Sequence, residues 1–167
     1  MLTTTLFPML LILATLLCAL TTGLLFTFAV VTMPGIKSLN DGEFIRAFQV
    51  MDGVIQNNHP LFVLVWAGSV LALLLTAVLG LTQLDTVGKA ILLTATALYL
   101  LGVQLPTGVI NIPLNNQLQT LDVGKMNRDD QAAARLTFEP RWNRWNRMRT
   151  AVATLVTTLL ILLLFLL

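Results

Sequence analysis

The chain is poor in charged residues and almost free of cysteine and histidine. Only 11% of its 167 residues are charged, whereas about 25% is usual in soluble domains. The single cysteine, Cys18, excludes an intrachain disulfide and thiol-based quinone chemistry. A glycine-rich phosphate loop, a GxSxG motif and a histidine-rich metal motif are all absent from the sequence. These absences disfavour phosphate-loop, serine-hydrolase and multi-histidine metal chemistry.

The sequence instead contains long apolar runs. The sequence is 56% hydrophobic, and four stretches contain no Asp, Glu, Lys or Arg. A helix needs roughly 20 apolar residues to cross a bilayer, and each stretch can supply one. The first lacks a basic start and is longer than the apolar core of a signal peptide, so we expect a retained helix. The expected spans are residues 5–31, 61–81, 87–109 and 150–167.

The segments between these spans complete the expected fold. Apolar residues at helical spacing predict a short amphipathic helix at the membrane interface, over residues 41–56. Prolines set the other boundaries, since a proline interrupts the helical hydrogen bonds. Pro34 should end the first helix, Pro106 should kink or break the third, and Pro140 should separate a helical piece from the fourth. We therefore expect an all-α integral membrane four-helix bundle, one domain over residues 1–167, with a longer, partly helical loop between helices 3 and 4.

Basic residues are unevenly placed. Nine of the ten lysines and arginines lie in the first and third loops, and Lys89 lies in the second. The positive-inside rule then places loops 1 and 3 in the cytoplasm and both termini outside, as in a bacterial inner-membrane protein. The basic cluster adjoins a membrane helix and is diluted by acidic residues, so membrane lipid is a better partner for it than nucleic acid.

The residues before the last span are the most informative. Residues 141–149 hold four arginines, two tryptophans and two asparagines, more polar groups than anchoring requires. Trp142, Trp145, Asn146 and Arg149 recur at spacings of three and four, so they share one helix face. In an up-down bundle this face meets the other polar regions at one end. The candidate site residues are Arg46, Asn58, His59, Asn111, Asn115, Asn116, Trp142, Trp145, Asn146 and Arg149.

Several of these residues have alternative interpretations. His59 is a free interfacial or capping residue, a proton acceptor, or a metal or haem ligand; one histidine without cysteine or paired carboxylates disfavours metal. Arg149 either reaches the headgroups or pairs with a buried polar or anionic substrate group. The asparagines at 111, 115 and 116 either satisfy the end of the third helix or bind a ligand. Ion pumping is disfavoured, because no expected span carries a carboxylate.

Five segments together resemble the anthrone oxygenase-like membrane proteins. The similar pieces are FAVVTMPG at 28–35, EFIRAFQ at 43–49, QNNHPLF at 56–62, NIPLNN at 111–116 and WNRWNRMRT at 142–150. The resemblance extends over nearly the whole chain, and the segments occur in the same order and spacing as in that family. The resemblance implies oxidation of an anthrone-type aromatic with molecular oxygen and no cofactor or metal.

The resemblance also suggests roles for the candidate residues. His59 would accept a proton, Trp142 and Trp145 would stack on a hydrophobic aromatic substrate, and Arg149, Asn146 and Asn115 would hold the oxyanion. The other substrate-binding candidates are Arg46, Asn58, Asn111 and Asn116. The alternative function is a non-catalytic membrane protein that binds a lipid or hydrophobic small molecule, or an accessory subunit. A homo-oligomer is compatible with either.

Overall fold

The computed structural model describes residues 2–167, with side chains from residue 6 onward, and this part of the chain contains helices and no strand. The all-α class expected from the sequence is therefore confirmed. The elements are α1 (Leu2–Thr27), η1 (Phe28–Thr32), α2 (Met33–Ile36), α3 (Asp41–Gln56), α4 (Pro60–Gln83), α5 (Thr86–Tyr99), η2 (Leu100–Gln104), η3 (Thr107–Asn111), α6 (Ile112–Gln119), η4 (Val123–Lys125) and α7 (Arg128–Leu166).

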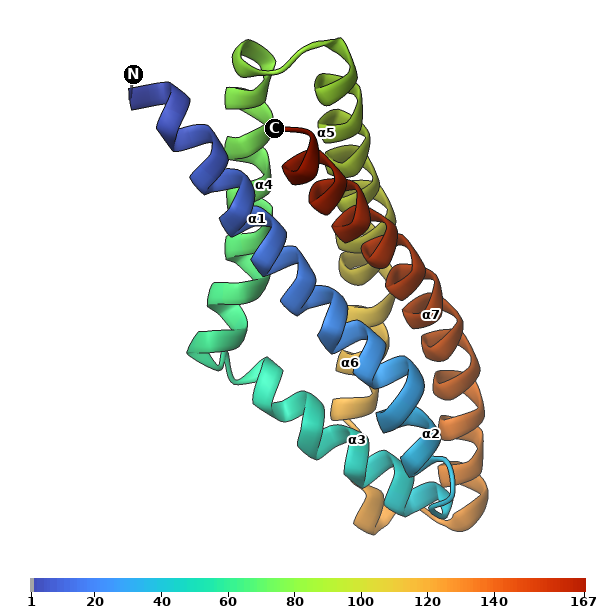
Figure 1. The fold of residues 1–167 in the computed structure, drawn as a ribbon. Coiled ribbons are helices and arrows are strands. Elements are labelled where there is room, and N and C mark those ends of the chain that lie inside the picture. The colour runs from blue at the N-terminus through green and yellow to red at the C-terminus, as the bar shows by residue number, and fades with distance from the viewer. Residues whose placement is uncertain (1) are drawn as a thin grey trace.

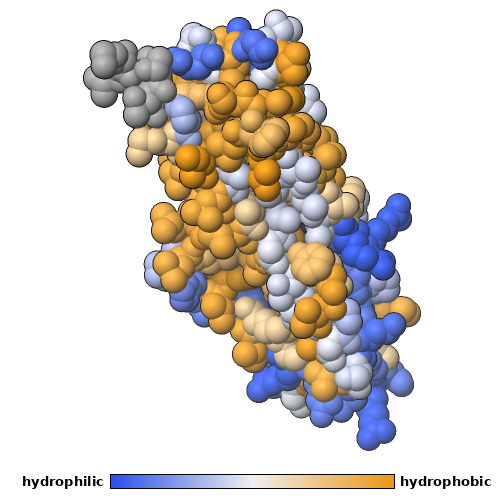
Figure 2. Space-filling view, in the orientation of Figure 1, coloured by the Kyte–Doolittle hydropathy of each residue, from blue (hydrophilic) through white to orange (hydrophobic). Residues whose placement is uncertain are grey.

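Four continuous helical stretches are long and apolar enough to cross a membrane, as expected of a membrane protein. They are Leu6–Ile36, Pro60–Gln83, Thr86–Gln119 and Arg128–Leu166. Each overlaps one of the spans predicted from the absence of charge. Figure 2 shows that hydrophobic side chains cover most of the visible surface between two more polar ends.

The long helices pack side by side along their apolar lengths. α1 contacts both α4 and α7, and α7 also contacts α5 (Figure 1). A fully buried cluster that includes Leu11, Tyr99 and Val156 fills the space between them. Gly102 permits one close approach, because a Cβ atom there would lie 2.7 Å from Cγ1 of Val152. Small residues at such contacts are typical of packed membrane helices.

α3 crosses the end of the molecule where α2 and the start of α7 lie (Figure 1). Its bounds, Asp41–Gln56, coincide with the predicted amphipathic helix. Asn40 caps it by accepting a hydrogen bond from the Glu43 amide, and the Glu43 carboxylate accepts one from the Asn40 amide. Its apolar face joins a second buried cluster with α6 and α7, made of Met33, Phe44, Ile45, Phe48, Leu114, Leu118, Phe138 and Trp142. Two residues of this cluster, Phe48 and Trp142, also line the candidate site.

The prolines do not interrupt the helices as the sequence suggested. The first helix continues past Pro34 to Ile36, and the third continues past Pro106 to Gln119. In each case the residue before the proline donates its amide five residues back, as in Met33 to Phe28 and Leu105 to Leu100. A proline ring in an α-helix clashes with the carbonyl four residues earlier. The wider π-helical turn relieves that clash at the point where it would occur.

Pro140 was expected to separate two helical pieces, but it lies inside α7. The buried side chains of Phe138 and Trp142 flank it and anchor both halves in the second cluster. Tertiary packing therefore outweighs the hydrogen bond that the proline removes. α7 begins after Asn127, whose side chain caps the helix by accepting a hydrogen bond from the Asp130 amide.

Candidate functional site

A cavity of about 180 Å³ lies among α1, α3, α4, the end of the third long helix and α7. One part of its wall is apolar and largely aromatic, and the other is polar. The apolar residues are Leu24, Leu25, Phe28, Phe48, Ile55, Phe62, Trp66, Ile112 and Trp142. The polar residues are Asp52, Thr107, Asn111, Asn115, Asn146 and Arg149. An apolar cavity with a few convergent polar groups is the usual form of a small-molecule site.

Arg149 is the buried cation of this cavity and is only 3% exposed. Its Nη1 donates to the Thr107 hydroxyl at 2.7 Å, and its Nη2 donates to Asn146 Oδ1 at 3.0 Å. Asn146 in turn donates from Nδ2 to the Leu25 carbonyl at 3.1 Å, which joins α7 to α1. Among the described residues Arg149 has no carboxylate partner within 4.0 Å. A buried guanidinium held only by neutral groups is suited to an anionic ligand group.

Asp52 is the buried anion of the same cavity and is only 2% exposed. Its Oδ1 accepts a hydrogen bond from Asn115 Nδ2 at 2.7 Å. Its Oδ2 accepts from Gln56 Nε2 and Gln119 Nε2, both at 3.0 Å. A carboxylate has about four acceptor sites, so three amide donors leave one unused, on Oδ1. Asp52 is therefore held firmly while keeping one lone pair free.

Trp142 connects the polar and the aromatic walls. Its Nε1 donates to Asn115 Oδ1 at 2.8 Å, which orients the amide that binds Asp52. Phe28 and Phe48 pack against its ring, with centroid distances of 5.6 and 5.4 Å. These contacts fix the ring as a rigid side of the cavity, next to the Arg149 guanidinium at 6.0 Å.

Two hydrogen-bonding groups in the cavity wall remain unused within the described residues. Both side-chain polar atoms of Asn111 lack a partner, although Asn111 is only 2% exposed. Arg149 Nε is likewise buried and unpaired. An unpaired buried polar group costs about 1–3 kcal/mol, so such groups are rare without a reason. Both residues line the cavity, so these unpaired groups belong to its polar wall.

The structure brings together half of the residues that the sequence put forward. Asn111, Asn115, Trp142, Asn146 and Arg149 all line the cavity. The remaining candidates lie outside the lining: Arg46, Asn58, His59, Asn116 and Trp145.

The structure places His59, which the sequence put forward as the base, outside the cavity lining. His59 directly precedes Pro60, the first residue of α4, and its exposed side chain makes no capping hydrogen bond. Asn58 is also exposed and takes a positive φ of 55° at the turn between α3 and α4. The turn thus uses Asn58 for its positive φ and directs the side chains of Asn58 and His59 outward. Asn116 is an exposed acceptor for Gln56 Nε2, at 2.9 Å.

Asp52 was not recognised from the sequence. It belongs to the short amphipathic helix, where a charged residue is normally assigned to the solvent face. The overlooked signal is its spacing, because Asp52 lies four residues after Phe48 and eight after Phe44, on the apolar stripe. A carboxylate on the buried face of an amphipathic helix needs partners, and Asn115 and Gln119 at helical spacing supply them.

The fold and the cavity define a class: helical membrane proteins with a buried polar pocket at one end of the membrane-long helices. The anthrone oxygenase family model matches residues 48–159 of the chain. The chain belongs to the anthrone oxygenase family. The matched residues include Asp52, Asn111, Asn115, Asn146 and Arg149, whereas the resembling segment at 28–35 lies outside them. No curated protein and no solved structure matches the chain.

Metal-ligating side chains do not gather in the structure. Across residues 2–167 no three of the His, Cys, Asp and Glu side chains form a group that could hold a metal ion. Asp52 is surrounded by amide donors rather than by further ligands.

Proposed function

We propose that the protein oxidises a lipophilic phenolic or polycyclic aromatic compound of the anthrone type with molecular oxygen and without a cofactor. The observation that carries the proposal is one cavity lined by both a buried carboxylate, Asp52, and a buried guanidinium, Arg149. Family membership supports the same class of reaction. Family and fold alone do not determine a substrate, whereas the groups that line the cavity limit the chemistry it can support.

The proposed first step is proton removal by Asp52. An anthrone has an acidic CH₂ group flanked by aromatic rings and conjugated to a carbonyl. The free lone pair on Oδ1 of Asp52 accepts a proton from this carbon, and the negative charge moves to the carbonyl oxygen. General-base catalysis of this kind contributes about 10²–10⁴ in rate. Asn115, Gln56 and Gln119 hold the carboxylate in place while it acts.

The proposed second role is stabilisation of the oxyanion. Arg149 Nε and Asn111 Nδ2 are the unused donors of the wall, and both would donate to the enolate oxygen. The rings of Trp142, Phe28 and Phe48 would flank the aromatic system of the substrate. Because these groups are fixed before the substrate binds, little reorganisation is needed when the charge forms.

Oxygen then reacts with the electron-rich carbanion. One electron passes to O₂, and the carbon radical and superoxide combine to form a C–O bond. Protonation of this peroxide gives a hydroperoxide, with the proton returned from Asp52. Loss of water from the hydroperoxide leaves a second carbonyl. The sum is CH₂ plus O₂ giving C=O plus H₂O, which requires no external reductant.

The size of the cavity favours a compact substrate over a membrane lipid. Its volume of about 180 Å³ lies below the range of roughly 300–1,000 Å³ typical of drug-sized ligands. A flat molecule of a few fused rings suits this space better than a phospholipid with two chains. Non-catalytic binding of a hydrophobic molecule remains the competing function, and the same experiment separates the two.

The test is oxygen uptake by the purified protein in detergent with anthrone as the probe. We expect wild-type protein to consume oxygen and form anthraquinone, and Asp52→Asn to lose at least 100-fold of that rate. Asp129→Asn is the matched control, because it removes an exposed carboxylate at the start of α7. Binding of anthrone without oxygen uptake by wild-type protein would instead establish non-catalytic binding. Equal rates in Asp52→Asn and wild type would refute the role of Asp52.

We also propose that the cavity end faces the cytoplasm, with both termini on the opposite side. The proposal rests on the concentration of lysine and arginine at that end of the molecule. Cysteine labelling with a membrane-impermeant reagent in a Cys18→Ala background tests it. If the reagent labelled Lys125→Cys but not Lys89→Cys in intact cells, the proposed orientation would be wrong.

A further inference from the structure

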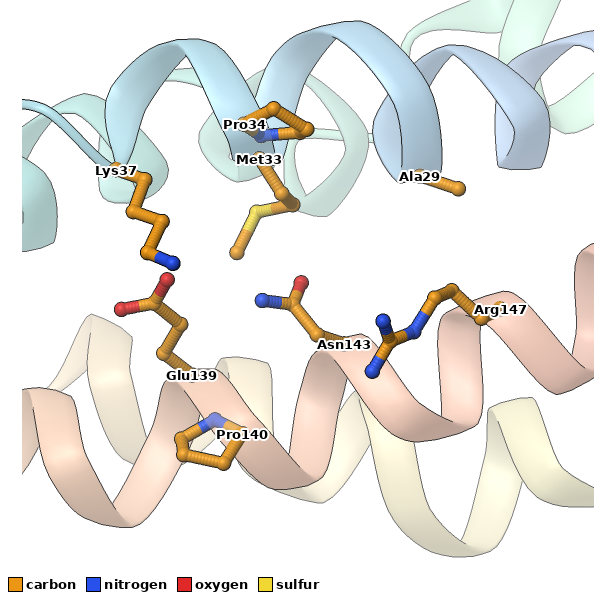
Figure 3. Close-up of a pocket in the computed structure, with 8 residues that line it drawn as sticks. All are labelled: Ala29, Met33, Pro34, Lys37, Glu139, Pro140, Asn143 and Arg147. Atoms are coloured by element: carbon orange, nitrogen blue, oxygen red, sulfur yellow. The ribbon is translucent and has the colours of Figure 1, made fainter.

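A second cavity lies on the outside of the molecule, between the end of the first long helix and α7. It is an open groove of about 540 Å³. Ala29, Met33 and Pro34 form one side, and Glu139, Pro140, Asn143 and Arg147 on α7 form the other. Figure 3 shows the Asn143 amide and the Arg147 guanidinium pointing from α7 into the gap, with the Lys37 ammonium at one end beside Glu139.

The charges in this groove are positive on balance. Its carboxylate, Glu139, already accepts a hydrogen bond at 2.8 Å from Arg135 Nε, a residue outside the lining. Within residues 2–167 neither Lys37 nor Arg147 takes part in an ion pair. Two cations and one amide donor therefore line the groove with a single carboxylate, which shares Arg135 with Asp41, so the net charge of the groove is positive. This arrangement suits a ligand with an anionic group of several oxygen atoms.

The groove lies at the depth of the lipid headgroups. Lys37 directly follows Ile36, the last residue of the first membrane-long helix. Arg147 precedes by three residues the charge-free stretch at 150–167. Next along the chain from Ala29, on η1, Val30 and Val31 are 53% and 62% exposed. An occupant of the groove thus meets cations at its head and an exposed apolar helix surface beside it.

We infer that this groove binds the headgroup of an anionic glycerophospholipid. The Arg147 guanidinium and the Asn143 amide donate to the phosphate oxygens, and the Lys37 ammonium lies close enough along the groove to share the charge. The acyl chains extend along the exposed valines of η1. A choline headgroup gains nothing comparable, because its ammonium faces the same two cations. This site is separate from the oxygenase cavity and does not depend on the proposed reaction.

Native mass spectrometry of the protein with phosphatidylglycerol or phosphatidylcholine tests the inference. We expect wild-type protein to retain phosphatidylglycerol preferentially. The Lys37→Gln/Arg147→Gln variant should bind it about 30-fold more weakly, equivalent to about 2 kcal/mol at about 1 kcal/mol per basic residue. Arg141→Gln/Arg144→Gln is the matched control, because it removes two exposed arginines of the same helix outside the groove.

Three results would overturn the inference. One is equal retention of phosphatidylglycerol by the groove variant and the control variant, which would indicate general surface attraction. Another is equal retention of phosphatidylcholine by wild-type protein. The third is displacement of the lipid by millimolar inorganic phosphate, which would identify a free-phosphate site. Thermal unfolding in lipid-free detergent accompanies each measurement, and unchanged unfolding of the groove variant excludes misfolding as the cause of a loss.

Discussion

Replacing Arg149 with methionine should remove catalysis while leaving the protein folded. Methionine fills a similar volume without the charge or the donors. The lost interactions are two hydrogen bonds from a charged group, to Thr107 at 2.7 Å and Asn146 at 3.0 Å. Each such bond contributes about 1.5–3 kcal/mol. Burying an ion costs several kcal/mol, so most of this loss is offset when the charge is removed.

The two partners of Arg149 also keep other bonds in the variant. The Thr107 hydroxyl still donates to the Val103 carbonyl at 2.6 Å, and Asn146 still donates to the Leu25 carbonyl. We therefore expect the free energy of unfolding to change by no more than about 2 kcal/mol. Loss of an oxyanion donor lowers kcat by about 10²–10³, a much larger effect than the change in stability.

Oxygen uptake with anthrone, alongside thermal unfolding in the same detergent, measures both quantities. Arg149→Lys keeps the charge but not the planar fork that reaches Thr107 and Asn146 together, so its rate should lie between those of wild type and Arg149→Met. Arg144→Met is the control for loss of an exposed arginine on the same helix. A folded Arg149→Met protein that keeps a third or more of the wild-type rate would refute the reasoning.

Three further predictions follow from contacts in the structure. Asn111→Leu should raise stability by about 1–3 kcal/mol, because it removes unpaired buried atoms, and should lower kcat in the uptake assay, because Asn111 is a proposed donor to the enolate oxygen; lower stability would show that the Asn111 amide is not unpaired. Gly102→Ala should destabilise by about 1–3 kcal/mol, since the added Cβ meets Val152 at 2.7 Å, whereas Gly23→Ala meets no atom within 4 Å and should not; equal melting temperatures would contradict this packing. His59→Ala should keep wild-type oxygen uptake because His59 is exposed outside the cavity, and a 100-fold loss would restore it as the base.

The fold could be predicted from the sequence where a single physical rule decides the outcome. Charge is excluded from the bilayer interior, so charge-free stretches marked all four membrane-long helices. Apolar residues at helical spacing likewise predicted the bounds of α3, Asp41–Gln56. These signals are local, and no other part of the chain competes with them.

The effect of the prolines on helix continuity could not be predicted correctly, because two local rules compete at each proline. A proline favours a break, but a π-helical turn placed before it keeps the helix continuous. Nothing in residues 100–106 distinguishes these outcomes without the packing of the neighbouring helices. Pro140 follows the same logic, since only the burial of Phe138 and Trp142 keeps α7 continuous through it.

The site was predicted in part for a related reason. Trp142, Asn146 and Arg149 share a helix face, so periodicity brought them together. Asp52 depends on amides from other helices, and its burial is decided by tertiary contacts that one helix cannot reveal. His59 stood out in the sequence as the only histidine, but the turn before Pro60 directs its side chain outward, away from the cavity.

The π-helical segments make the geometry of the cavity depend on the number of residues in the third helix as well as on their identity. Each residue advances an α-helix by roughly 100°, whereas a π-helical turn takes up one additional residue with little rotation of the helix beyond it. Deletion of Leu101, which is 65% exposed, would thus leave Thr107 and Asn111 facing the cavity, but it would return the turn before Pro106 to the α-helical repeat in which the proline ring clashes. Deletion of a residue from α5, where no π-helical turn takes up the change, would instead rotate Thr107 and Asn111 away from Arg149 and remove the free amide from the cavity.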